Sequence, residues 1–145
     1  MSAGRIVRKE TEGIFKATGA NTDGRFEFMI LDVGYRFGPP LHVHDDQEDT
    51  FYVLDGVLTA QIDEDIVELK EGDFASAPPG VAHTFTNASQ KQVARMVNVM
   101  TPGIGFDHYI TAAMSGVDQA EMERLAKEYG VTIVGPTLAE KLGLD

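Results

Sequence analysis

Residues 38–56 read GPPLHVHDDQEDTFYVLDG, and residues 72–87 read GDFASAPPGVAHTFTN. The first stretch holds His42 and His44, one residue apart, and the second holds His83. Side chains two positions apart on a β-strand lie on the same face, so His42 and His44 present their imidazoles side by side. Imidazole is a ligand for zinc, copper, iron and nickel alike. The two stretches therefore predict a metal site built on strands.

The sequence around these stretches predicts a fold of many short strands. Residues 66–87 carry two short strands, which are broken by turn signals at Gly72-Asp73 and Pro78-Pro79-Gly80. Asp55-Gly56 lies between two apolar runs, a hairpin signal that requires positive φ at both turn residues. Further strands are predicted within residues 24–33, 50–62 and 91–100. Short strands at this spacing are typical of an all-β sandwich or barrel, here over about residues 24–103.

The sequence after the strand-rich region predicts helices instead. Residues 115–118 resemble a capping box, and apolar residues follow at helical spacing as far as Tyr129, after which Gly130 is suited to end the helix. Pro136 is suited to open a final short helix, and Gly143 to end it. We expect residues of about 105–145 to form a helical extension packed on the barrel, so that residues 1–145 make a single domain.

Composition and charge narrow the class of protein. The chain has 145 residues, of which 43% are apolar, as in ordinary globular domains. Its net charge of −11 disfavours nucleic acid and anionic membranes as partners. It has no cysteine, and we find neither an apolar run of about 18 residues nor a secretory signal. We therefore expect a cytoplasmic protein without disulfides.

The two histidine stretches resemble the two motifs of the cupin superfamily. The first motif runs glycine, HxH, three or four residues, glutamate, six residues, glycine. The second runs glycine, five residues, proline, any residue, glycine, two residues, histidine, three residues, asparagine, and residues 72–87 match it at every specified position. The resemblance implies a double-stranded β-helix, that is, a jelly-roll barrel with one divalent metal ion inside it. It also implies His42, His44 and His83 as ligands, and a homodimer.

The fourth ligand of that family is the motif glutamate, and this chain departs from the motif there. Six residues separate Asp49 from Gly56, as the motif requires, whereas Glu48 keeps the shorter spacing after His44. The two acidic side chains lie on opposite faces of a regular strand, so only one can point inward. Asp49 fits the spacing but is one methylene shorter than glutamate. We therefore expect Asp49 to act as a base near the metal and His108, just past the barrel, to complete the metal shell.

An apolar cavity above the metal would receive a small aromatic or polyketide substrate. The residues predicted to line it are aromatic or sulfur-containing, with one tyrosine and one arginine as polar contacts: Phe28, Phe51, Phe85, Met96, Phe106, Tyr35 and Arg95.

Three functions are compatible with such a site, because the cupin fold does not fix the reaction. The preferred one is a polyketide cyclase that catalyses aldol-type ring closure, with the metal as Lewis acid, since the chain resembles cupin-type aromatic polyketide cyclases of the resistomycin type. The alternative is a quercetinase-like dioxygenase, against which the missing glutamate counts. The third is a small-molecule-binding cupin without catalysis. A site built from imidazoles favours zinc, with iron, nickel, manganese or copper as alternatives.

Overall fold

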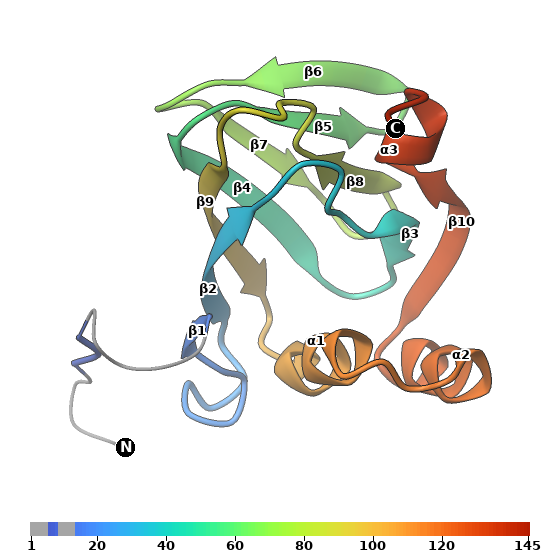
Figure 1. Ribbon diagram of the computed structural model, residues 1–145. Coiled ribbons are helices and arrows are strands. Elements are labelled where there is room, and N and C mark those ends of the chain that lie inside the picture. Colours follow the sequence, from blue (N-terminus) through green and yellow to red (C-terminus); the bar gives the residue numbers. More distant parts are fainter. Residues whose placement is uncertain (1–5, 9–13) are drawn as a thin grey trace.

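The described part of the chain is built on two antiparallel sheets (Figure 1). The structure is a computed structural model that describes residues 6–8 and 14–145. The strands of these residues are β1 (Phe15–Ala17), β2 (Glu27–Val33), β3 (Pro40–His44), β4 (Glu48–Asp55), β5 (Leu58–Ile62), β6 (Asp65–Leu69), β7 (Phe74–Ala77), β8 (His83–Thr86), β9 (Ala94–Thr101) and β10 (Val131–Thr137). The same residues also form three short helices, which follow β9 or lie near the end of the chain: α1 (Phe106–Met114), α2 (Gln119–Glu128) and α3 (Leu138–Lys141). The predicted all-β jelly roll is confirmed.

The core lies between the two sheets, whose strand orders are β1-β2-β9-β4-β7 and β10-β3-β8-β5-β6. Alternation along each strand sends one set of side chains inward. On β9, for example, Ala94, Met96, Asn98 and Met100 are buried while Arg95 is exposed. Three of these four inward residues are apolar, so Asn98 is the exception among them. The stretch 66–87 forms three strands, β6, β7 and β8, rather than the two predicted.

The predicted hairpin at Asp55-Gly56 is wrong, although strands do flank it. β4 belongs to one sheet and β5 to the other, so the chain crosses between sheets at this point. Among the described residues the positive φ falls on Gly56 (φ 77°) and not on Asp55. A Cβ atom at Gly56 would lie 2.7 Å from the carbonyl oxygen of Val93. Gly56 therefore allows both the left-handed turn and the close approach of the chain before β9.

Replacing Gly56 with alanine should lower the free energy of unfolding by about 2–5 kcal/mol. About 1–2 kcal/mol comes from the left-handed backbone, and the remainder from the contact with Val93. Gly72 is a matched control, because its φ is 90° but a Cβ there would meet nothing within 4 Å. Urea denaturation should therefore show Gly72→Ala losing only about 1–2 kcal/mol. Equal losses in the two variants would show that the approach to Val93 is not tight.

The C-terminal region is not wholly helical, as it was predicted to be. The predicted helix is present as α2, but its N-cap is Asp118, whose carboxylate accepts a hydrogen bond from the Glu121 N–H, rather than Ser115. The final short helix also forms, as α3, although it begins after Thr137 and not at Pro136. Between them β10 pairs with β3, so the C-terminal region completes a sheet. None of the helices in the described residues is long and apolar enough to span a bilayer.

Candidate metal centre

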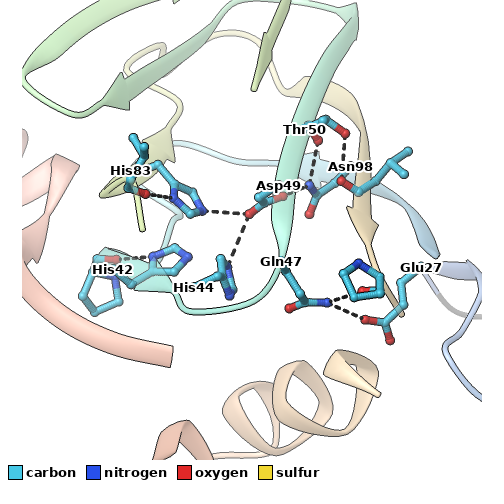
Figure 2. A network of polar contacts seen from close by, with 12 residues as sticks. Glu27, His42, His44, Gln47, Asp49, Thr50, His83 and Asn98 are labelled. Atoms are coloured by element: carbon cyan, nitrogen blue, oxygen red, sulfur yellow. Dashed lines mark hydrogen bonds and ion pairs between the residues drawn. The ribbon is translucent and has the colours of Figure 1, made fainter. Parts of the chain in front are cut away.

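Four buried side chains from both sheets converge inside the barrel. His42 and His44 come from β3, His83 from the neighbouring strand β8, and Asp49 from β4 of the opposite sheet. Their candidate ligand atoms all lie within 4.8 Å of one another. Figure 2 shows the imidazoles of His44 and His83 turned toward the carboxylate of Asp49. Such a set of three imidazoles and one carboxylate can hold a single divalent metal ion.

The residues before His42 bring β3 against β8. His42 and His83 are directly paired across these two antiparallel strands. A Cβ atom at Gly38 would lie only 1.9 Å from the carbonyl oxygen of Phe85, so only glycine permits this approach. The hydroxyl of Thr84 donates a hydrogen bond of 2.6 Å to the carbonyl of Pro39. The glycine and proline of the first histidine stretch therefore place β3 so that its imidazoles reach the ring of His83.

In His42 and His83, hydrogen bonds to the backbone determine which ring nitrogen is available to bind a metal. The Nδ1 of His42 lies 2.8 Å from the carbonyl oxygen of Pro40, and the Nδ1 of His83 lies 2.9 Å from that of Val81. A carbonyl can only accept, so each Nδ1 carries a proton and each Nε2 is the ring nitrogen left to face the cluster. This is the arrangement that orients imidazole ligands in metal sites.

His44 supports a metal at this position independently. Both of its ring nitrogens are buried and lack a hydrogen-bond partner among the described residues. Its Nε2 lies 3.6 Å from Asp49 Oδ2, which is too long for a hydrogen bond. A buried polar atom without a partner is costly, and a metal ion between His44 and Asp49 would satisfy it. The residues present therefore fit a metal ion.

The charges of the four groups suit metal binding. Burial, together with the nearby His83 and His44, lowers the pKa of His42 to about 3, so this ring is neutral at pH 7. Burial alone would raise the pKa of Asp49, but the attraction of His44 and His83 outweighs it and holds that pKa well below its usual range. At neutral pH the cluster thus offers a neutral imidazole and an ionised carboxylate, which are the forms that bind metal.

Asp49 takes the place in the cluster for which His108 was predicted. His108 lies on α1 with its side chain 68% exposed, and its Nε2 is 4.0 Å from the Asp107 carboxylate. α1 begins with Phe106, which points inward against the His44 ring, and two residues further on the helix faces another way. The structure therefore does not bring His108 to the metal centre. The aspartate side chain is long enough to reach the cluster, because Asp49 Oδ2 lies 2.9 Å from His83 Nε2.

The two acidic neighbours on β4 point to opposite faces, as expected. Asp49 is buried inside the barrel, whereas Glu48 accepts a hydrogen bond from the hydroxyl of Ser76. The spacing to Gly56 therefore identified the inward residue correctly.

An apolar cavity of about 460 Å³ adjoins the metal centre, and His42 and Asp49 form part of its wall. β2, α1 and β10 contribute apolar side chains such as Met29, Ile110 and Val131 to the rest of the wall, which also includes residues of β8, β9, α2 and the segment before β3. No lysine or arginine of the described chain is among the lining residues. A larger hollow of about 570 Å³ lies between α2 and β10 and contains none of the four cluster residues.

Two of the seven predicted pocket residues, Phe85 and Phe106, line this cavity. Phe51 and Met96 are packed in the core, and Arg95 forms an exposed ion pair with Asp32 instead. Phe28 and Tyr35 are half-buried and are not among the lining residues. Sequence reasoning missed Asn98 and Tyr109, which both line it. Asn98 could have been found as a polar residue at an inward position of an otherwise apolar strand face.

The helix α1 closes one side of the cavity and is held by a buried acid. Glu27 is 0% exposed, and its carboxylate accepts hydrogen bonds from the backbone N–H groups of Phe106 and Asp107 at 3.1 and 3.4 Å. The side-chain amide of Gln47 donates to the same carboxylate at 3.3 Å (Figure 2). Burial raises the pKa of Glu27. These contacts fix the start of α1, so Phe106 packs against His44 with ring centroids 5.1 Å apart.

A jelly-roll barrel with imidazoles and a carboxylate meeting inside it is the architecture of a cupin. The sequence profile of the cupin domain family matches residues 27–100, and the chain belongs to that family. The chain is similar to quercetin 2,3-dioxygenase of Bacillus subtilis, with 32% identity over 112 residues that cover 77% of this chain and 32% of the relative. The matched region thus spans about a third of that relative's length.

Solved structures agree on the fold. A cupin protein from Bacteroides fragilis superposes with a TM-score of 0.60 at 17% identity, covering 72% of this chain and 88% of the other. An RmlC-like cupin from Shewanella frigidimarina superposes with a TM-score of 0.58 at 17% identity, covering 70% and 94%. At these identities the likeness concerns the fold alone.

Proposed function

We propose that this protein is a metal-dependent dioxygenase that acts on a planar, uncharged polyphenol of the flavonol class. The observation that carries the proposal is the position of Asp49, which joins three imidazoles at the wall of an apolar cavity. The sequence comparison supports the same reaction, because the relative from Bacillus subtilis is a quercetin dioxygenase.

The cavity supports an uncharged aromatic substrate. Its lining is mainly apolar, with aromatic rings from Phe85, Phe106 and Tyr109. Lysine and arginine, which would pair with a carboxylate or phosphate, are absent from the described lining residues. Its volume of about 460 Å³ is within the range of sites for small organic ligands. A flat phenolic substrate would therefore bury its rings there and present a hydroxyl group to His42 and Asp49, the part of the wall next to the metal centre.

The cluster of three histidines and Asp49 provides the groups that the reaction needs. His42, His44, His83 and Asp49 would hold the metal, and a redox-active divalent ion there would supply electron transfer between the bound substrate and dioxygen. Asp49 is ionised at neutral pH and lines the cavity. A carboxylate has about four lone-pair sites, so one that neither the metal nor a hydrogen bond uses can accept the proton of a substrate hydroxyl. A carboxylate in the shell also favours an oxidised metal, so we now place iron, manganese, nickel or copper before zinc. Phe106, whose backbone N–H is held by Glu27, covers one side of His44.

The predicted polyketide cyclase would use the same features, because ring closure also needs an enolate, a base and an apolar cavity. It becomes the second candidate, since the carboxylate in the cluster removes the main argument against oxygen chemistry. Dioxygen consumption separates the two reactions.

An oxygen electrode tests the proposal directly. We expect metal-free protein reloaded with iron, manganese, nickel or copper to consume one dioxygen for each quercetin molecule, because both oxygen atoms enter the product. Protein loaded with zinc is the control and should bind quercetin without oxygen uptake, since zinc has no redox chemistry. Quercetin bound with no uptake in any of the five metal forms would refute the dioxygenase. Ring closure of a polyketone by the zinc form would then establish the cyclase.

A further inference from the structure

Asn98 touches the metal centre from the opposite side to the histidines. It lies on β9, next to β4 in the sheet, and is buried. Its side-chain amide donates one hydrogen bond to Asp49 Oδ1 and another, of 2.8 Å, to the backbone carbonyl of Thr50 (Figure 2). The amide is therefore anchored to the backbone of β4 beside the carboxylate that it contacts.

The two carboxylate oxygens of Asp49 have different partners. Asp49 Oδ1 is occupied by Asn98, while Oδ2 lies 2.9 Å from His83 Nε2 and 3.6 Å from His44 Nε2. The terminal torsion of an aspartate is broad, so an unrestrained carboxylate would turn among several orientations. A short side chain cannot compensate for a wrong orientation by bending at a further bond. The hydrogen bond from Asn98 therefore selects the orientation in which Oδ2 faces the imidazoles.

We propose that Asn98 is a positioning residue that aims the short carboxylate of Asp49 at the metal. Asp49 and Asn98 then work as a pair that replaces the longer glutamate of the cupin motif. The proposal rests on the metal centre of the proposed function but not on the identity of the reaction. Partners of this kind typically change metal affinity by about 10- to 100-fold.

A double-mutant cycle on metal affinity tests this pairing. Affinity for cobalt or zinc is measured by competition with a coloured chelator in four proteins: wild type, Asn98→Ala, Asp49→Glu and the double variant. With aspartate at position 49, Asn98→Ala should weaken binding about 10- to 100-fold. In the Asp49→Glu background, the longer side chain reaches the metal without help, so Asn98→Ala should change affinity less than about threefold. The same loss in both backgrounds, or no loss with aspartate, would overturn the proposal.

A matched control separates positioning from a general effect on the fold. Asn87 is also buried, and its amide donates to two backbone carbonyls, those of Val33 and Gln92, at 2.9 and 2.7 Å. Asn87→Ala should lower thermal stability and leave metal affinity unchanged. Asn98→Leu, which keeps the branched shape of the side chain but cannot donate, is the second variant should Asn98→Ala fail to fold. It should show the same dependence on the length of residue 49, and equal losses in both backgrounds would again refute the pairing.

The outcomes also distinguish this inference from the proposed function. If the coupling is observed but no metal form consumes dioxygen, Asn98 keeps its role and the dioxygenase is wrong. If dioxygen is consumed but no coupling is found, the reaction stands and Asn98 has only a structural role.

Discussion

Replacing His44 with alanine should reduce bound metal from about one equivalent to less than about a tenth of an equivalent after dialysis. The ring of His44 has no other partner for its nitrogens among the described residues, so its whole polar contribution is the bond to the metal. Its loss also leaves Asp49 and His83 as a pair that can satisfy each other at 2.9 Å without metal. Elemental analysis of purified protein measures the effect.

His108→Ala is the control for this experiment, because it also removes an imidazole but from an exposed position. It should retain its full equivalent of metal. A loss of metal in His108→Ala as large as that in His44→Ala would place His108 in the shell after all. Retention of a full equivalent by the double variant His42→Ala/His44→Ala would show that the metal is bound elsewhere.

Replacing Asp49 with asparagine should lower turnover at least about 100-fold, the usual contribution of a positioned general base. The variant keeps the shape of the side chain but loses the negative charge that both the metal and the substrate proton require. Because Asp49 lies within the cluster, metal affinity should fall as well. Steady-state kinetics of metal-saturated protein separates the loss of turnover from the loss of metal.

Glu48→Gln is the matched control, since it removes the charge of the neighbouring residue, whose carboxylate contacts Ser76 and not the cluster. It should keep near-normal turnover. Full activity in metal-saturated Asp49→Asn would show that the carboxylate is neither base nor essential ligand.

The strands and the three imidazoles could be predicted because their signals are local. Alternation over a few residues marked β2, β4 and β9, and the HxH spacing placed His42 and His44 on one face before any pairing was known. The spacing to Gly56 likewise separated Asp49 from Glu48. The pairing of His42 and His44 depends only on the geometry of a single strand. His83 and Asp49 were instead identified by the spacing of the two cupin motifs.

The predictions that were wrong concern features that depend on contacts between segments far apart in the sequence. The turn at Gly56 looks like a hairpin locally, and only the pairing of β4 and β5 with strands of different sheets shows that the chain crosses there. β10 is a strand because β3 offers it a free edge some 90 residues earlier in the sequence. His108 was predicted to complete the metal shell, but the helix that begins at Phe106 turns its side chain outward.

For the same reason, the contact between Asn98 and Asp49 could not be predicted from the sequence motifs. The two residues are 49 positions apart and meet because β4 and β9 are neighbours in the sheet. Considered alone, the shorter aspartate at position 49 suggested that the fourth metal ligand of the cupin motif was missing. Beside Asn98 it can serve as a ligand whose orientation is fixed by a neighbouring strand.

The most direct test of the metal centre is a crystal structure of protein loaded with one transition metal, with anomalous scattering recorded at the absorption edge of that metal. We predict a single strong peak inside the barrel, bonded at about 2.0–2.2 Å to the imidazoles of His42, His44 and His83 and to Asp49 Oδ2. A peak bonded to His108, or an empty barrel in protein that consumes dioxygen, would contradict the account.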